Sequence, residues 1–166
     1  MKSFSQFPTP NKKNIDFILT DIDDTLTHSG RLPADVFVAM ERLKKSDIRT
    51  IPITGRPAGW CDHIARMWPV DGLVGENGAF YFFYDTKQKK MIRRYFKSRS
   101  ERLRDQKKLD TLKEEILRNV PGSDVSADQA YREADLAIDF CEDVVPPLST
   151  EDIDRICSII EEEGAT

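Results

Sequence analysis

The sequence is poor in the residues that build disulfide frameworks and zinc sites. It contains three cysteines and two histidines among 166 residues. The cysteines, Cys61, Cys141 and Cys157, are odd in number and include no pair spaced as CxxC, which argues against both kinds of site. We expect reduced thiols and a cytoplasmic protein, since disulfides are rare in that compartment.

Long hydrophobic runs are also missing. The longest apolar runs have the length of a β-strand, whereas a membrane-spanning helix needs about 20 apolar residues. Residues 1–14 are rich in Ser, Pro, Lys and Asn and contain no hydrophobic stretch of the kind that a signal peptide requires, so they are expected to form a tail. No membrane partner is therefore predicted.

An excess of positive charge is absent as well. The formal net charge is -4 and the pI is about 5.3, which argues against nucleic acid as a partner. Residues 85–108 are mainly basic and residues 139–166 mainly acidic. We interpret both stretches as solvated surfaces, of which the basic one would also attract a small phosphorylated metabolite.

A group of carboxylates follows directly after the first apolar run. Residues 15–19 are mostly apolar, and Asp21, Asp23 and Asp24 come next. Carboxylates this close repel one another unless a cation neutralises them. The arrangement therefore predicts a metal site, and Mg²⁺ is the expected cofactor because proteins hold it with one or two carboxylates together with water and phosphate.

The positions of these carboxylates give them different expected roles. If residues 15–19 form a buried strand, Asp21 lies at its carboxyl end, where open α/β sheets place their ligands. Asp21 is then the candidate nucleophile for attack on phosphorus, and Asp23 is close enough to act first as an acid and then as a base. Asp24 is the weaker candidate, because an Asp in a turn often has only a capping role.

Strand and helix patterns alternate along the first half of the chain. After the first strand come a helix from Pro33 to Ser46, a strand at 48–53, a helix at 58–67 and a strand at 70–74. This order predicts an α/β fold with a partial doubly wound, Rossmann-like parallel sheet. Asp21, Thr54 and Glu76 each follow a strand, so their loops should meet at one edge of the sheet.

Three motifs in this half resemble those of a known superfamily. DxDxT at residues 21–25, TGRP at 54–57 and GENGA at 75–79 occur in the order that is typical of the haloacid dehalogenase superfamily. GENGA resembles the Cof-type, class IIB members, which include sugar-phosphate phosphatases. The resemblance implies a Mg²⁺-dependent phosphatase that acts on a small phosphomonoester, with sugar phosphates as the substrate class.

The same resemblance assigns roles to individual residues. It implies Asp21 as the nucleophile and Asp23 as the acid and base, with the Asp21 carboxylate and the Asp23 main-chain carbonyl as Mg²⁺ ligands. Phosphate or substrate contacts are implied for Thr54, Gly55, Arg56 and Asn77. Arg56 could equally form a surface ion pair, and the glycines of GENGA would also be explained by a tight turn.

The second half of the chain predicts a cap. Strand patterns at 79–84 and 91–96 indicate a hairpin, followed by a charged helix at 101–120, a strand at 136–140 and a last helix that starts near residue 150 and stops at Gly164. We therefore expect a tail at 1–14, the first half of the core at 15–80 and an incomplete α+β cap domain at 81–166.

Two motifs of the superfamily are not found. Neither the Lys that neutralises the phosphoryl oxygens nor a GDxxxD-like acidic loop has a match in the sequence. We therefore expect an incomplete, weakly active chain whose first strand has no neighbour on its outer edge. An unpaired edge favours strand pairing between molecules, so we expect a homo-oligomer.

Two other functions fit parts of the sequence. A non-catalytic phosphate-binding or regulatory module would keep the anion site without turnover. A receiver-like signalling domain also has acids after its first strand, but its phosphorylated Asp follows the third strand, where this chain has GENGA. His28 and His63 are expected to have structural or surface roles, and Trp60 and Trp68 are expected in the core. For Tyr131, Arg132 and Glu133 the sequence allows either a polar loop or a contact with the substrate.

Overall fold

The computed structural model describes residues 4–6 and 15–165. Contacts between residues divide the chain into a first unit, Met1–Arg56 with Trp60–Tyr95, and a second unit, Pro57–Gly59 with Phe96–Thr166. The expected tail at 1–14 lies outside the described residues except for a short 3₁₀ helix, η1 (Phe4–Gln6).

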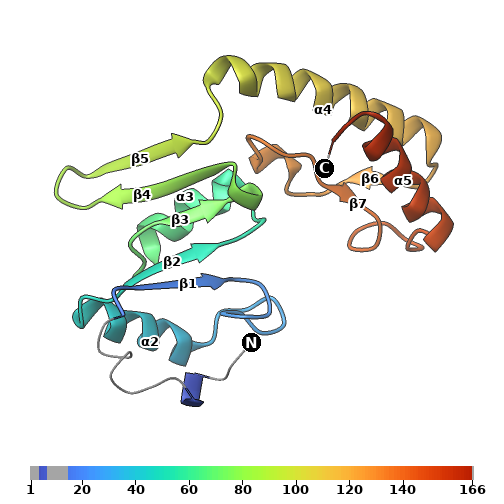
Figure 1. Cartoon of the computed structure of the whole chain (residues 1–166). Coiled ribbons are helices and arrows are strands. Elements are labelled where there is room, and N and C mark those ends of the chain that lie inside the picture. The colour runs from blue at the N-terminus through green and yellow to red at the C-terminus, as the bar shows by residue number, and fades with distance from the viewer. Residues whose placement is uncertain (1–3, 7–14, 166) are drawn as a thin grey trace. The chain divides into compact units, whose positions relative to one another are not determined.

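The first unit contains a five-stranded sheet with the order β1-β2-β3-β4-β5 (Figure 1). Its strands are β1 (Phe17–Asp21), β2 (Arg49–Ile53), β3 (Leu73–Gly75), β4 (Phe80–Asp85) and β5 (Lys90–Tyr95). The first three are parallel, and β4 and β5 continue the sheet as an antiparallel hairpin. The predicted α/β fold is confirmed. Because the hairpin extends the first sheet, the units divide after residue 95, whereas we expected a boundary at residue 80.

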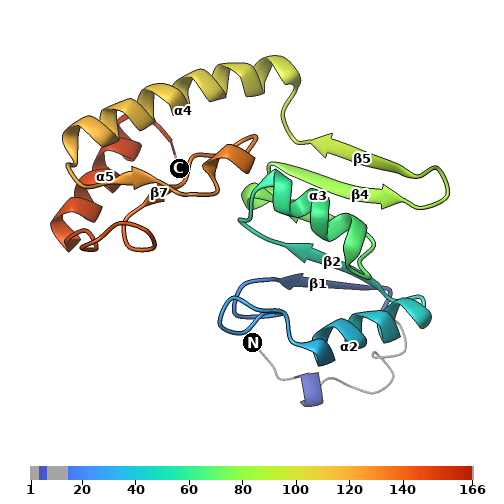
Figure 2. The same ribbon diagram turned by 180° about the vertical axis from the view of Figure 1, so that it is seen from behind.

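Two helices connect the parallel strands. α2 (Ala34–Lys45) begins after Pro33, joins β1 to β2 and buries Met40. α3 (Ala58–Met67) joins β2 to β3 and buries Cys61. Both connections step in the same direction along the sheet, so right-handed crossovers place both helices on one face. α3 lies behind the strands in Figure 1 and in front of them in Figure 2.

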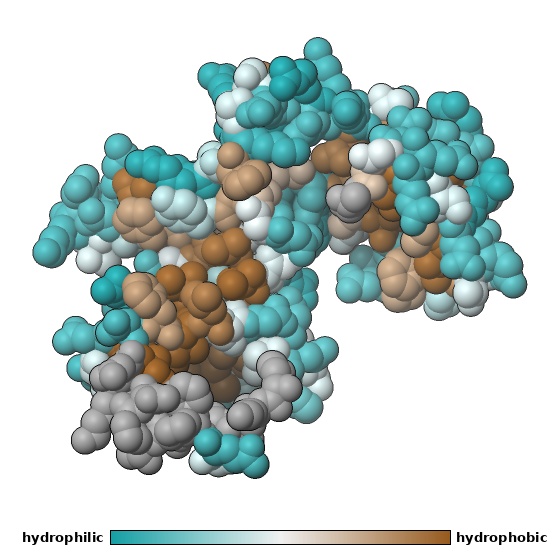
Figure 3. All heavy atoms as spheres, viewed as in Figure 1, coloured by the Kyte–Doolittle hydropathy of each residue, from teal (hydrophilic) through white to brown (hydrophobic). Residues whose placement is uncertain are grey.

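The two faces of this sheet differ in exposure. On the face that the helices cover, the buried side chains include Thr50, Leu73, Phe80 and Phe82. On the other face, Phe17, Leu19, Ile53 and Tyr81 are 47%, 63%, 40% and 49% exposed, and we call these four residues the bare face. Apolar surface is visible over the strands of this unit in Figure 3.

The prediction that the first strand is buried is therefore wrong for two of its residues. Phe17 and Leu19 point to the bare face, while the intervening Ile18 is partly covered. Successive side chains of a strand point to opposite faces, and α2 and α3 cover only one of them. An apolar run predicts a strand that is covered on both faces, but among the described residues of this unit helices cover only one face of the sheet.

The second unit packs two helices together. α4 (Arg99–Asn119) and α5 (Thr150–Glu162) share a buried core, with the short strand β7 (Ile138–Asp139) packed against it through Ile138. This core consists of Leu112, Ile116, Val120, Ile156 and Ile159. β7 pairs with β6 (Asp124–Val125), and η3 (Gln129–Tyr131) lies between them in sequence. Both predicted helices are confirmed, whereas the strand expected at 136–140 is shorter.

Both of these helices begin at a serine cap. The Oγ of Ser98 accepts a hydrogen bond from the Glu101 N–H at 3.3 Å, and the Glu101 carboxylate accepts the Ser98 N–H at 2.8 Å. The Oγ of Ser149 accepts the Asp152 N–H at 3.2 Å. Such caps satisfy donors that the first helical turn leaves unpaired. None of the helices that the structure describes is both long and apolar enough to cross a membrane.

Candidate active site

The acidic loop after β1 is a compact turn built on one carbonyl. The main-chain oxygen of Ile22, a buried residue, accepts hydrogen bonds from the N–H groups of Thr25, Leu26 and Thr27 at 3.3, 2.9 and 2.9 Å. The Thr27 hydroxyl donates to the same oxygen at 3.0 Å. This loop therefore holds Asp21 and the carboxylates after it in a defined order at the carboxyl end of β1.

The three carboxylates of this loop have different surroundings. The Thr25 hydroxyl donates to the Asp21 Oδ2 at 3.4 Å, which restrains the predicted nucleophile while leaving it exposed. Asp24 has a φ of 55°, in the left-handed region that Asp tolerates better than most residues, and its N–H donates to the Thr27 hydroxyl at 3.2 Å. Asp24 thus forms part of the turn, as its weaker assignment anticipated.

Hydrogen bonds join the loops that follow β2 and β3. The N–H of Thr54, a buried residue, donates to the Val74 carbonyl at 3.0 Å, and the Thr54 carbonyl accepts the Asn77 N–H at 3.3 Å. The Glu76 N–H donates to the Arg56 carbonyl at 3.3 Å. TGRP and GENGA therefore meet at one edge of the sheet, as expected for loops at the carboxyl ends of neighbouring parallel strands.

Two glycines in these loops are explained by close contacts. A Cβ at Gly55 would lie 3.1 Å from the Asn77 Oδ1, so the Asn77 side chain lies against the backbone of TGRP. A Cβ at Gly75 would overlap the Phe80 ring and would lie 2.6 Å from the Cys61 Sγ. Gly75 is thus required because β3 packs closely against β4 and α3, and not only because the chain turns here.

An ion pair connects the acidic loop to TGRP. The Nη2 of Arg56 lies 2.8 Å from the Asp23 Oδ1, and its Nε lies 3.2 Å from both carboxylate oxygens. The Arg56 guanidinium also lies over the Trp60 ring, with the Cζ 4.6 Å from the ring centroid. β1 and β2 pair Asp21 with Ile53, the residue before Thr54. The structure thus brings Asp21, Asp23, Thr54, Gly55, Arg56 and Asn77 together at one end of the sheet.

The metal site is supported by the donor set only in part. Among residues 4–6 and 15–165, no group of three or more His, Cys, Asp or Glu side chains is arranged to hold a metal ion. One carboxylate and one carbonyl, from Asp21 and Asp23, still suit an ion such as Mg²⁺ that takes water and substrate phosphate as its other ligands. The Asp23 carboxylate is neutralised by Arg56, so charge crowding in this loop does not by itself require a metal.

The family was identified by comparison with known proteins. The model of the haloacid dehalogenase-like hydrolases matches residues 18–124. The chain belongs to this family. No curated protein matches it. The resemblance that the DxDxT, TGRP and GENGA motifs carried is thereby confirmed at the level of the family.

Several solved structures share this fold. The Thermoplasma acidophilum protein 0175 superposes with a TM-score of 0.68 and 16% identity over 90% of this chain and 58% of its own. A haloacid dehalogenase-like hydrolase from Bacteroides thetaiotaomicron gives 0.56 and 18% over 88% and 63%. The IMP-nucleotidase of Plasmodium falciparum gives 0.56 and 9% over 90% and 41%. The chain of this protein therefore spans about three fifths of the length of the Thermoplasma and Bacteroides proteins.

Other residues singled out from the sequence lie apart from this site or play different roles. His28 and His63 are exposed. Trp60 is 47% exposed and stacks on Arg56, so the prediction that it belongs to the core is wrong. Arg56 precedes α3, so no helical spacing in the sequence linked it to Trp60.

In the second unit, Arg132 holds a loop together. Its guanidinium pairs with Asp128 at 2.9 Å and with Asp135 at 3.0 Å, and its side chain is largely buried. These two carboxylates raise the pKa of Arg132 against the opposing effect of burial, which is the larger single influence. Tyr131 and Glu133, on either side, are exposed. Of the two readings that the sequence left open, the contacts of Arg132 favour a structured polar loop.

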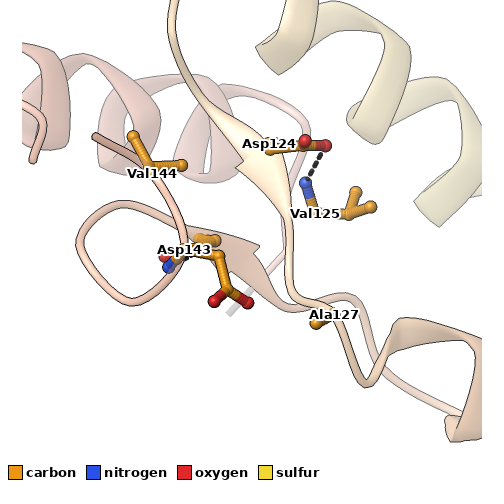
Figure 4. A pocket seen from close by; sticks show the side chains of 6 residues that line it. Asp124, Val125, Ala127, Asp143 and Val144 are labelled. Atoms are coloured by element: carbon orange, nitrogen blue, oxygen red, sulfur yellow. Dashed lines mark hydrogen bonds between the residues drawn. The ribbon is translucent and has the colours of Figure 1, made fainter. Parts of the chain in front are cut away.

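A second group of carboxylates lies in the same unit. Asp124, Asp139 and Asp143 line a cavity of about 160 Å³ together with Val125, Ala127 and Val144 (Figure 4). Asp139 is 6% exposed and accepts hydrogen bonds from the N–H groups of Cys141, Glu142 and Asp143 at 2.9, 2.8 and 2.7 Å. Its oxygens are thus occupied by the backbone of the loop that follows β7.

Proposed function

We propose that this chain carries the catalytic loops of a phosphatase that hydrolyses a small phosphomonoester through an aspartyl-phosphate. The observation that supports this best is the juxtaposition of an exposed Asp21 at the end of β1 with the Asp23–Arg56 pair and Thr54. A sugar phosphate is the proposed substrate class, on the likeness of GENGA to the Cof-type phosphatases.

In the proposed reaction the Asp21 carboxylate attacks phosphorus, and a bond from oxygen to phosphorus forms as the ester bond to the leaving oxygen breaks. Asp23, once it has taken up a proton from solvent, gives that proton to the leaving oxygen, and the resulting carboxylate then takes one from the water that hydrolyses the aspartyl-phosphate, which releases inorganic phosphate. Asp23 is reachable for both transfers, since its side chain is 43% exposed beside Arg56.

Thr54 and its neighbours would hold the phosphoryl group. The Thr54 hydroxyl accepts the Arg56 N–H at 3.0 Å and keeps its own hydrogen to donate to a phosphoryl oxygen. Asn77 lies against Gly55 and contributes amide donors at the same edge. The Asp21 carboxylate and the Asp23 carbonyl are the proposed ligands of Mg²⁺, which when bound would supply positive charge against the phosphoryl oxygens.

The test is hydrolysis of a panel of sugar phosphates and of p-nitrophenyl phosphate by the full chain, with and without Mg²⁺. Turnover should be slow, because the sequence has no match to the superfamily's Lys and acidic-loop motifs, and D21N should lower it on the order of 10³-fold or more. D24N is the matched control and should keep the activity. Binding of beryllofluoride without any turnover would contradict the phosphatase and favour a phosphate-binding module.

We also propose a cytoplasmic location and self-association. Cys61, Cys141 and Cys157 are all free thiols, which supports a reducing compartment. Among the described strands β1 has a partner on one side only, and its open edge adjoins Phe17 and Leu19 of the bare face. A second copy would cover both. Light scattering should show a mass that rises with concentration and falls in L19K; a strict monomer at high concentration would contradict self-association.

A further inference from the structure

Trp60 occupies an unusual position for a tryptophan. Its side chain is 47% exposed although α3 buries Cys61 and Ile64 next to it in the covered layer. A large apolar ring exposed to this extent contributes little to the core. The ring instead lies under the guanidinium of Arg56, with 4.6 Å from the Cζ to the ring centroid.

This stacking bears on the geometry of Arg56. The Arg56 side chain is 32% exposed, and ion pairs that are open to solvent are held weakly because long side chains keep many rotamers. A guanidinium that stacks on an aromatic ring has one face shielded from water and its plane fixed. In that plane the Nε and Nη2 of Arg56 both reach the Asp23 carboxylate, at 3.2 and 2.8 Å.

We propose that Trp60 is a positioning residue for Asp23. Its ring fixes the Arg56 guanidinium, and the guanidinium holds the Asp23 carboxylate where it takes a proton from the water that hydrolyses the aspartyl-phosphate. This inference rests on the proposed function. A carboxylate that rotates freely would present its oxygens to that water less often, so hydrolysis of the aspartyl-phosphate would slow.

The experiment compares W60L with W60F in the full chain. W60L keeps an apolar side chain but removes the ring, and W60F restores a ring face. M67A, which removes another exposed side chain from α3, is the matched control. Circular dichroism and the thermal midpoint establish that each variant folds, and W60F remains informative if W60L does not.

Two readings are taken. The first is the rate at which the aspartyl-phosphate made from acetyl phosphate disappears, together with kcat and KM for a phosphomonoester. We expect W60L to lower the dephosphorylation rate and kcat about tenfold with KM unchanged, a fraction of what a general acid and base contributes. W60F should recover most of the loss, and M67A should behave as wild type.

The second reading is hydrogen exchange of the Arg56 Nε–H, followed by NMR. Exchange should be faster in W60L than in wild type or W60F, because the hydrogen bond to Asp23 opens more often. A wild-type chain that forms no phosphoenzyme would overturn the proposed function and this inference with it. A phosphorylated wild type whose W60L variant dephosphorylates and exchanges at wild-type rates would overturn the role of Trp60 alone.

Discussion

The two groups of carboxylates in this protein differ in how their oxygens are used. Asp139, in the second unit, is buried, and three backbone N–H groups fill its acceptor positions. Asp21, in the first unit, is exposed at the end of β1 and accepts a long hydrogen bond of 3.4 Å from Thr25. Asp23 is half-exposed and paired with Arg56. One group shapes a loop, and the other presents charge to solvent.

Crowding of acids in a sequence therefore does not by itself identify a reactive site. Asp124, Asp139 and Asp143 even line a cavity, yet the buried carboxylate among them is occupied by the main chain. The acidic loop of the first unit differs from this group because Asp21 is exposed at the carboxyl end of a parallel strand, next to the TGRP loop.

The largest effect should follow from D23N. We expect turnover of a sugar phosphate to fall about 10²- to 10⁴-fold, because the acid and base is lost. The thermal midpoint should change little, since an ion pair this exposed contributes little to stability. Steady-state kinetics and thermal denaturation measure the two. Unchanged turnover would show that Asp23 takes no part in the reaction, and would contradict the difference in role between the two groups of carboxylates.

The converse change is D139A. It leaves three backbone N–H groups of a buried loop without their acceptor, so the thermal midpoint of the chain should fall by several degrees. Binding of beryllofluoride by the first unit should persist wherever the variant is folded. Loss of that binding in the folded variant, without a change in the midpoint, would mean that the roles of the two groups are reversed.

A smaller effect is expected in the pH dependence of stability. Backbone hydrogen bonds, first from Glu142 and then from Asp143, hold the pKa of Asp139 below its ordinary value. A lowered folded-state pKa contributes stability that is present above the unfolded value, about 3.9, and is lost as the pH falls through the folded value. The midpoints of wild type and D139N should therefore converge in acid. A constant difference between them down to the lowest pH would contradict this linkage.

The smallest effect should come from D24N within the acidic loop itself. Asn also tolerates the left-handed φ of 55° at this position, and the N–H that bonds Thr27 is retained. Turnover and the thermal midpoint should both stay close to wild type, within about threefold for the rate. A loss as large as that of D23N would show that the third carboxylate of the loop takes part in the chemistry.

Much of the first unit could be predicted from its sequence. The alternation of strands and helices, the meeting of the loops after β1, β2 and β3, and the hairpin of β4 and β5 follow from local patterns and from the geometry of parallel strands. The exposure of Phe17 and Leu19 could not be predicted, because the sequence of a strand does not show whether helices cover both of its faces.

Contacts between distant side chains were the other part that the sequence could not supply. Arg56 could have formed an ion pair elsewhere on the surface. Its partner Asp23 lies 33 positions away in the sequence, and only the fold brings the two side chains together. Trp60 was assigned to the core because tryptophans are usually buried, whereas the guanidinium covers its ring instead. Gly75 is required by the Phe80 ring and Cys61, which come from two other elements.

The most direct test of the account is to locate a phosphoryl group on the chain. The D23N variant is incubated with Mg²⁺ and acetyl phosphate, whose leaving group needs no protonation, so that the intermediate forms but is hydrolysed slowly. Mass spectrometry of its peptides should find one phosphoryl group on Asp21, which is absent when D21N is added. A chain without a phosphoryl group, or one that carries it on Asp124, Asp139 or Asp143, would contradict the account.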